Sequence, residues 1–177
     1  QVHLLDKNIG RLRHVDQIQM GRITTVASNR GAVERAVAEA DLVIGAVLVP
    51  GGRAPVVVSE EMVRSMNPGA VVIDIAIDQG GCVETSHETT HADPVFERHG
   101  VVHYAVGNMP GAVPHTSTHA LTNATLPYLA ELAHRGAADA VRRDPALALG
   151  LNVAGGRIVN AAVAEALGTT VAPLDEA

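Results

Sequence analysis

Hydrophobic and polar positions alternate in a regular order along the first part of the chain. Short apolar runs of strand length are separated by longer segments in which apolar residues recur every three or four positions, as Ile9, Leu12 and Val15 do. In chain order, strands are expected at residues 2–5, 23–27 and 42–49, and helices at residues 8–20 and 29–40, the second capped by Asn29. Strands that alternate with helices in this way predict βαβ units and a parallel sheet.

The alternation continues beyond the third strand. A short extended piece at residues 56–58 and a helix at residues 60–66 precede an Asn-Pro-Gly turn at residues 67–69. The next strand, residues 71–77, is β-branched or small except for Asp74. This is the pattern of a strand that is buried on both faces of a parallel sheet.

After a last strand at residues 101–106, the pattern changes to Ala-rich helical segments. A long helix is expected at residues 117–133, with an interruption at Pro127, which lacks a backbone donor. Further helices are expected at residues 137–142, 145–149 and 157–167, and Gly168 ends the last of them. These segments predict packing elements that cover another layer, such as a second domain.

Composition fits a single α/β core and excludes several other classes. The 177 residues are 47% hydrophobic, and the formal net charge is -6. The 13 Lys and Arg residues are scattered, and two Tyr, one Phe and no Trp offer almost no platform for stacking on bases, so no nucleic-acid partner is expected. No apolar run reaches the roughly 20 residues of a membrane span. The first residues lack a signal-peptide pattern, and we expect a cytoplasmic protein without a membrane partner.

Neither the cysteine nor the histidines form a reactive pattern. The single Cys82 excludes an internal disulfide, which fits a reducing compartment, and no evident base lies near it in the sequence. The histidines in the middle of the chain do not share a compact ligand spacing with a carboxylate, so no metal site is expected. They are His87, His91, His99, His103, His115 and His119.

An acidic residue followed by two glycines marks the end of the strand at residues 71–77. Asp78 would lie at the carboxyl end of that strand, where ligands bind in open α/β sheets. No Lys or Arg lies within ten residues of Asp78, so a local ion pair does not explain it. The alternative is a turn or capping residue, with Gly80 and Gly81 forming a simple bend. Asp78 is therefore a candidate active-site carboxylate.

Asp6 ends the strand at residues 2–5. In a dinucleotide-binding fold an acidic residue here hydrogen-bonds the adenosine ribose, about 20 residues after a glycine-rich loop. The alternative is a carboxylate that the dipole of the next helix favours. No such loop precedes Asp6, and in the 3-2-1-4-5-6 strand order a missing first strand leaves a gap between the strands that start at Val2 and Leu42. The predicted fold class is α/β, a Rossmann-like parallel sheet with flanking helices that lacks its first strand and cannot close alone.

Four strings of residues together closely resemble the NAD-dependent L-alanine dehydrogenases, in the alanine dehydrogenase and transhydrogenase alpha-subunit family. They are LVIGAVLVPG at residues 42–51, IDIAIDQGGC at 73–82, NMPGAVPHTST at 108–118 and ALTNATLPY at 120–128. The resemblance extends over essentially the whole chain. It implies an incomplete dinucleotide-binding domain at residues 1–114 and, at residues 115–177, the C-terminal helical part of the substrate or catalytic domain.

The resemblance also implies a function. That family converts L-alanine reversibly to pyruvate and ammonium in L-alanine catabolism, with NAD as the hydride acceptor, and usually forms homo-hexamers. Asp78 resembles the catalytic carboxylate beside the nicotinamide, which orients the attacking water or ammonia. Asn108 and Met109 resemble the loop that lines the nicotinamide and substrate. The other implied cofactor contacts are Asp6 at the ribose, Ser28 at the adenine, Val47 and Leu48 at the pocket wall, and Arg11, Ile75 and Val106.

The family's substrate-binding Arg, catalytic Lys, catalytic His and glycine-rich loop lie in an N-terminal segment that no part of this chain matches. We therefore expect a fragment that needs this segment and has no turnover alone. The alternatives are the cofactor domain of a proton-translocating transhydrogenase and a catalytically silent NAD-binding assembly module. Saccharopine-type dehydrogenases share the architecture but not the strings. Asp6 favours NAD over its 2′-phosphorylated form, because a carboxylate repels that phosphate, whereas Lys7 and Arg11 act in the opposite direction.

Overall fold

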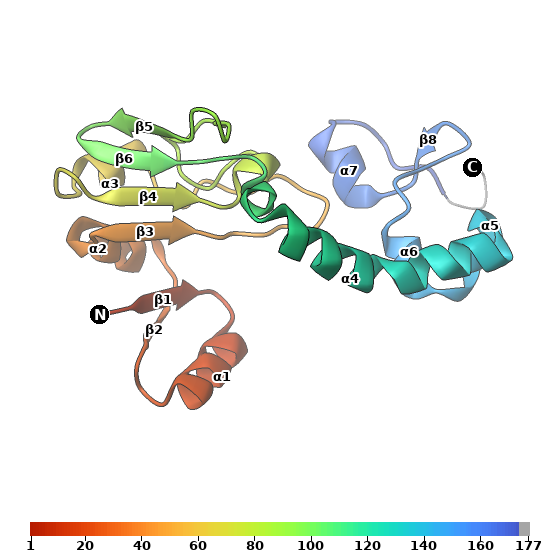
Figure 1. Ribbon diagram of the computed structural model, residues 1–177, viewed down its shortest axis with the longest axis horizontal. Helices are drawn as coiled ribbons and strands as arrows, with labels where there is room; N and C mark the ends of the chain where they lie inside the picture. The colour runs from red at the N-terminus through yellow and green to blue at the C-terminus, as the bar shows by residue number, and fades with distance from the viewer. Residues whose placement is uncertain (174–177) are drawn as a thin grey trace. The chain divides into compact units, whose positions relative to one another are not determined.

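The computed structural model describes residues 1–173, which divide into two compact units (Figure 1). Unit 1 comprises Gln1–Leu48 and Ala54–Gly107. Unit 2 comprises Val49–Arg53 and the described residues from Asn108 onward. None of the described helices combines the length and apolar character needed to cross a membrane.

Unit 1 begins with a parallel βαβ pair (Figure 1). Strands β1 (His3–Asp6) and β2 (Thr24–Ala27) run parallel, and helix α1 (Ile9–Gln19) connects them. Helix α1 begins where it does because the Asn8 side chain accepts a hydrogen bond from the backbone N–H of Arg11. The predicted strands and helix of this region are confirmed to within one or two residues.

The larger sheet of unit 1 has the strand order β3-β4-β6-β5. Its strands are β3 (Leu42–Gly45), β4 (Val71–Asp74), β5 (Val95–Arg98) and β6 (Val101–Tyr104). Strands β3, β4 and β6 are parallel, with Ile73 opposite both Ile44 and Tyr104, so their carboxyl ends meet at one edge of the sheet. Strand β5 runs antiparallel beside β6. The helices α2 (Arg30–Glu39) and α3 (Glu60–Arg64) are capped by the side chains of Asn29 and Ser59.

The core of unit 1 brings together apolar side chains from both helices and the larger sheet. Val63 of α3, Val72 of β4 and Val101 of β6 have no exposed surface. Leu5 of β1 packs against the same cluster, so the small β1–β2 pair shares this core. Burial of apolar surface is the main favourable contribution to folding, and it fixes the strands whose ends carry the candidate site.

The two sheets of unit 1 do not join. Among residues 1–173, β1 pairs only with β2 and β3 pairs only with β4, so both strands keep one edge unpaired. Leu42 and Ile44 of β3 are 51% and 55% exposed. The predicted gap in the sheet is confirmed. One parallel strand between β1 and β3 would complete the strand order of a Rossmann-like sheet.

Three strands of unit 1 are shorter than predicted. β3 ends at Gly45 rather than at residue 49, and β6 ends at Tyr104 rather than at residue 106. β4 ends at Asp74 rather than at residue 77, because the Asp74 side chain accepts a hydrogen bond from the Ala76 backbone and turns the chain. The prediction that this strand is buried on both faces is also wrong, since alternate residues of β4 are only partly buried.

Strand β5 was not predicted. Its sequence, Val-Phe-Glu-Arg, shows neither a continuous apolar run nor a period of two, and its residues remain largely exposed at the edge of the sheet. Edge strands with charged residues are common, because only one side of the strand needs a partner. β5 is therefore a strand because it pairs with β6, and its own sequence does not indicate a strand.

Unit 2 consists mainly of helices and buries little of its own surface. Its elements are η2 (Met109–Ala112), α4 (Pro114–Arg135), α5 (Ala137–Arg143), α6 (Pro145–Leu149), β7 (Val153–Ala154), β8 (Arg157–Ile158) and α7 (Ala161–Ala166). Among the residues of unit 2 that the structure describes, only Ala140 and Ala164 are buried.

Two predictions for unit 2 are wrong. The long helix continues through Pro127, because a proline removes one backbone hydrogen bond and this helix has solvent around it to satisfy the freed carbonyl. The helix predicted at residues 157–167 is instead a β7–β8 hairpin followed by α7. Gly155 and Gly156 adopt positive φ in the hairpin turn, and Asn160 caps α7 by accepting from Ala162 and Val163.

Candidate functional site

Asp78 lies in the loop that leaves the carboxyl end of β4. After Asp74 the chain makes a turn and forms the short 3-10 helix η1 (Ile77–Gln79). Gly80 and Gly81 follow with φ of 97° and 78°, a conformation that favours glycine. The Asp78 side chain is exposed. Asp78 therefore lies four residues beyond the end of β4 and not directly at the end of a strand as predicted, and its catalytic role stays a prediction.

The residues that follow β3 come to the same edge of the sheet as Asp78. The Ile75 N–H donates to the Gly45 carbonyl oxygen at 2.8 Å, which continues the pairing of β3 with β4. Val47 packs against the core, whereas Leu48 and Ile75 are 67% and 50% exposed. This edge of unit 1 therefore offers apolar surface next to a carboxylate.

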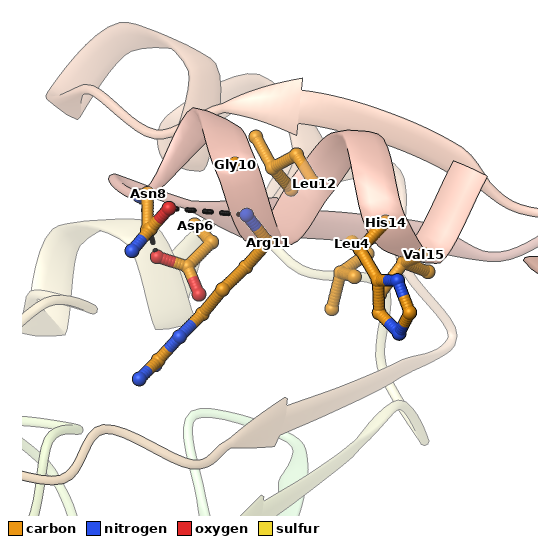
Figure 2. Close-up of a pocket in the computed structure, with 8 residues that line it drawn as sticks. All are labelled: Leu4, Asp6, Asn8, Gly10, Arg11, Leu12, His14 and Val15. Carbon is orange, nitrogen blue, oxygen red and sulfur yellow. Dashed lines mark hydrogen bonds between the residues drawn. The ribbon is translucent and has the colours of Figure 1, made fainter. Parts of the chain in front are cut away.

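Asp6 and Ser28 lie together at the carboxyl ends of β1 and β2. The Ser28 N–H donates to the Asp6 carbonyl oxygen at 2.9 Å. Asp6 Oδ1 accepts a hydrogen bond from the Asn8 N–H at 2.8 Å, as the alternative reading of a helix N-terminal carboxylate requires. Asp6 Oδ2 accepts none from the described residues, and Arg11 extends past this carboxylate (Figure 2). One oxygen of Asp6 can thus hold the turn while the other meets a ligand.

A depression of about 520 Å³ opens beside Asp6 (Figure 2). It is lined by Leu4, Asp6, Asn8, Gly10, Arg11, Leu12, His14 and Val15. Most of its walls are formed by α1 and β1, the elements next to the unpaired sheet edge. The depression therefore places the Asp6 carboxylate, of which one oxygen is hydrogen-bonded, next to the apolar side chains of Leu4, Leu12 and Val15.

The remaining predicted cofactor contacts have different surroundings. Val106 is 2% exposed, so its side chain cannot line an open site and only its backbone could contact a ligand. Asn108 and Met109 belong to unit 2, where Asn108 precedes η2. The cofactor contacts predicted for these three residues stay predictions.

Asp74 is a residue of this region that sequence reasoning did not select. It has no exposed surface, and its carboxylate accepts hydrogen bonds from the backbone N–H groups of Ala76, Cys82 and Val83. An acidic residue within an apolar strand was the available signal. The partners at residues 82 and 83 could not be inferred, because they depend on how the loop folds back.

Cys82 lies against Asp74 and is 1% exposed. Burial raises the pKa of the Cys82 thiol to about 11, and the nearby Asp74 carboxylate acts in the same direction. The thiol is therefore protonated at neutral pH, so Cys82 is not an activated nucleophile.

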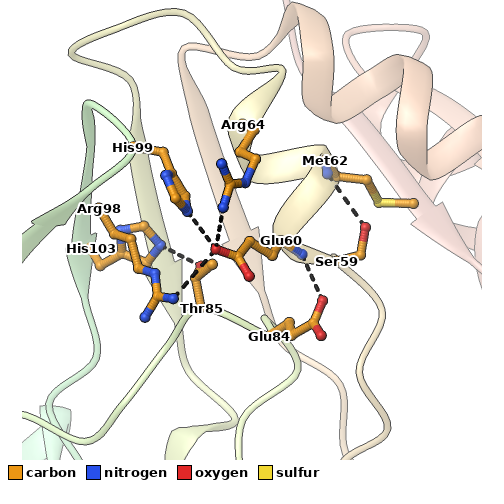
Figure 3. Close-up of polar contacts among 9 residues, drawn as sticks. All are labelled: Ser59, Glu60, Met62, Arg64, Glu84, Thr85, Arg98, His99 and His103. Atoms are coloured by element: carbon orange, nitrogen blue, oxygen red, sulfur yellow. Dashed lines mark hydrogen bonds and ion pairs between the residues drawn. The ribbon is translucent and has the colours of Figure 1, made fainter.

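A second polar cluster surrounds Glu60 (Figure 3). Glu60 Oε1 lies 2.6 Å from His99 Nε2, 2.9 Å from Arg64 Nη2 and 3.3 Å from Arg98 Nη2. The hydrogen bond from His99, followed by that from Arg64, lowers the pKa of Glu60 to about 2. These contacts tie the start of α3 to the turn between β5 and β6, which is a structural role.

His103 of β6 is buried and held in one tautomer. Its Nδ1 lies 3.0 Å from the Val101 carbonyl oxygen, which can only accept, so Nδ1 carries the proton. Its Nε2 then accepts from the Thr85 hydroxyl at 2.7 Å. Burial lowers the pKa of His103, and Phe96 stacks on its ring at 4.8 Å. His103 is thus a neutral, fully paired residue within unit 1.

Comparison with known proteins gives one consistent result. The family model described as "Alanine dehydrogenase/PNT, C-terminal domain" matches residues 1–161. The chain is 54% identical over 177 residues to an alanine dehydrogenase of Bacillus subtilis, covering 99% of this chain and 47% of that protein. It is 49% identical over 178 residues to an alanine dehydrogenase of Methanococcus maripaludis, covering 100% of this chain and 48% of that protein.

Solved structures agree with these relatives. A structure titled L-alanine dehydrogenase matches with a TM-score of 0.81 and 51% identity, over 95% of this chain and 46% of that one. A transhydrogenase from Sinorhizobium meliloti matches with a TM-score of 0.68 and 25% identity, over 91% of this chain and 42% of that one. The chain spans about half the length of the curated relatives it matches.

Proposed function

The chain belongs to the alanine dehydrogenase/PNT family, and we propose that it forms the cofactor-binding half of an NAD-dependent L-alanine dehydrogenase. The reaction converts L-alanine, NAD⁺ and water to pyruvate, ammonium, NADH and a proton. The observation that carries the proposal is the identity of about half of all residues to alanine dehydrogenases along the whole chain. The exposed Asp78 loop at the sheet edge supports it independently.

Residues at the carboxyl ends of β1 and β2, and residues just beyond the carboxyl ends of β3 and β4, fit the binding of a dinucleotide. Asp6 has one carboxylate oxygen engaged by the Asn8 N–H and the other available to a ribose hydroxyl. Leu48 and Ile75 offer exposed apolar surface of the kind that packs against a flat ring. When bound, NAD⁺ supplies the hydride acceptor, and the protein supplies position and electrostatics.

In this proposal Asp78 is the catalytic carboxylate. After the ammonium group of alanine has released a proton, loss of hydride from C2 leaves the substrate as an iminium, whose positive charge a nearby carboxylate stabilises. Asp78 holds the water that attacks the iminium carbon and accepts a proton from it as the C–O bond forms. The C=O bond of pyruvate then forms as the C–N bond breaks, and the nitrogen takes the proton held by Asp78 and the proton of the new hydroxyl group, so that it leaves as ammonium. The two glycines that follow, both with positive φ, allow the chain to turn sharply next to Asp78.

The unpaired strand edges suggest what the rest of the enzyme contributes. A parallel strand between β1 and β3 would satisfy the backbone groups of both edges and cover the exposed Leu42 and Ile44. We propose that this strand, the phosphate-binding loop and the substrate-binding residues come from the half of the relatives that this chain does not match.

Reconstitution tests the proposed function. The chain is mixed with the unmatched half of the Bacillus subtilis alanine dehydrogenase, and NADH absorbance is followed with L-alanine and NAD⁺. We expect NADH formation by the mixture and none by the chain alone. Asp78→Asn should lower the rate by about a hundredfold or more, whereas Asp16→Asn, an exposed carboxylate on α1, should leave it unchanged. A stable complex without NADH formation would contradict the proposal and favour a silent assembly module.

The transhydrogenase likeness provides the second candidate function. Its lower identity, 25% against 51%, favours the alanine dehydrogenase. If the reconstituted protein transferred hydride between two nicotinamide nucleotides without L-alanine, the transhydrogenase function would be favoured over the alanine dehydrogenase function. We further propose a homo-hexameric assembly in the cytoplasm; light scattering on the reconstituted protein and cell fractionation test these two points.

A further inference from the structure

Asp74 ends β4 and has no exposed surface. A buried carboxylate is costly unless its oxygens are hydrogen-bonded. Here every bond comes from the loop that follows the strand. The Ala76 N–H donates to Oδ1 at 3.1 Å, the Cys82 N–H to Oδ2 at 3.0 Å and the Val83 N–H to Oδ2 at 3.0 Å.

These donors lie at the two ends of one loop. Ala76 is two residues after Asp74, whereas Cys82 and Val83 are eight and nine residues after it. The single carboxylate therefore closes the segment between residues 76 and 82 into a ring. Asp78 lies inside that ring, four residues after Asp74 in the sequence.

The packing around the carboxylate shows that the loop is closed tightly. A Cβ on Gly81 would lie 3.0 Å from Asp74 Oδ2, and a Cβ on Gly45 would overlap Cys82 Sγ. The Cys82 thiol also donates to Asp74 Oδ1, at 3.5 Å. Glycines at these two positions let the neighbouring strand and the returning loop approach the carboxylate.

We propose that Asp74 is a positioning residue that holds the Asp78 loop in its working conformation. The inference rests on the proposed catalytic role of Asp78. Charge-assisted hydrogen bonds to backbone N–H groups are stronger than neutral ones, so one buried carboxylate can fix a glycine-rich loop that would otherwise be mobile.

The position requires a carboxylate and not only its shape. Both oxygens of Asp74 accept from backbone N–H groups. In Asp74→Asn, either orientation of the amide places an NH₂ group against at least one backbone N–H. Two donors then face each other, and a buried donor is left without a partner. Asp78→Asn, by contrast, changes an exposed group on the same loop.

Amide hydrogen exchange on the chain itself tests the loop closure without any assay of activity. In the wild-type chain the amides of Ala76, Cys82 and Val83 should exchange about as slowly as that of Val72 in β4. Asp74→Asn should speed exchange at these three amides by about tenfold or more, since roughly 1.4 kcal/mol corresponds to a factor of ten. Asp78→Asn is the matched control and should leave them unchanged. Fast exchange in the wild type, or no change in Asp74→Asn, would overturn the proposal.

Thiol labelling gives a second readout. Cys82 is buried against Asp74, so iodoacetamide should label it slowly in the wild type and in Asp78→Asn, and faster in Asp74→Asn. If Asp74→Asn does not fold, the wild-type chain still tests the loop closure: amides of Ala76, Cys82 and Val83 that exchange much faster than the Val72 amide would overturn the proposal.

In the reconstituted enzyme, Asp74→Asn should lower kcat more than it raises KM for L-alanine. Asp74→Glu should not restore the rate, because its longer side chain does not fit the closed loop. Equal activity of Asp74→Asn and wild type would refute the positioning role. Absence of activity in the wild-type assembly would instead refute the proposed function and leave the exchange result standing.

Discussion

Unit 1 and unit 2 differ in how much apolar surface each buries by itself. Unit 1 buries Val63, Val72 and Val101 completely. Helix α4 of unit 2 has 22 residues and none of them is buried, with Leu121 and Leu126 65% and 63% exposed. Helices gain most of their stability in proteins from packing an apolar face. Unit 1 therefore has the core of a folding unit, whereas unit 2 presents apolar side chains that need a partner surface.

The candidate site residues also divide between the well-packed unit 1 and the poorly packed unit 2. Asp6 and Asp78 belong to unit 1; Asp6 is the last residue of β1, and Asp78 lies in the loop after β4, and the core of unit 1 fixes both strands. Asn108 and Met109 belong to unit 2 and lie before or in a short 3-10 turn. The chain spans about half of its relatives' length, and its open surfaces include the unpaired strand edges and α4. Unit 1 by itself thus has the buried core that fixes the strands carrying these two candidate residues.

The largest expected effect is on the free energy of unfolding, when a buried residue of unit 1 and an exposed residue of unit 2 are each replaced by alanine. Met62 of α3 is 5% exposed, and Met62→Ala should lower the free energy of unfolding of the chain by about 2–5 kcal/mol. Leu126→Ala, at an exposed position of α4, should change it by less than about 0.5 kcal/mol. Urea unfolding followed by circular dichroism measures both. Equal effects would show that α4 is packed in the free chain.

Pro127→Ala tests whether the stability of helix α4 in unit 2 can change without any effect on unit 1. The substitution restores the N–H that can bond to the Asn123 carbonyl oxygen, so it should stabilise α4 by up to about 3 kcal/mol and raise the helical signal. Unit 1 should be unaffected, which the exchange rates of β4 and β6 amides would report. A loss of helical signal would mean that the proline is needed for a bend in α4.

The smallest effect concerns acid stability of unit 1. Glu60 has a folded-state pKa of about 2 against an ordinary value of 4.5, so its ionised form is favoured by folding. This contribution is complete above about pH 4.5 and is lost as the pH falls toward 2. Glu60→Gln should therefore flatten the decline in unfolding free energy across that window. Parallel pH profiles for the variant and the wild type would contradict this assignment.

Sequence patterns predicted the local features of unit 1 well. The cap at Asn29 and the end of the first strand at Asp6 depend on residues a few positions apart, and sequence patterns report such relations directly. The gap in the sheet followed from strand order. The resemblance, rather than the patterns, supplied the substrate and the cofactor.

What the sequence could not predict depends on distant partners or on solvent. The Asp74 contacts need the loop to return eight residues later, and β5 is a strand only because β6 lies beside it. The Pro127 interruption and the helix at residues 157–167 were wrong because local propensity was given too much weight. The assignment of residues 1–114 and 115–177 to two domains stays a prediction.

Hydrogen exchange on the chain alone and with the unmatched half of the Bacillus subtilis enzyme is the most direct test of a two-part enzyme. The account predicts new protection in two places, the β3 edge at Leu42–Gly45 and helix α4, together with NADH formation from L-alanine. Unchanged exchange at both places in a mixture at saturating concentration would contradict it.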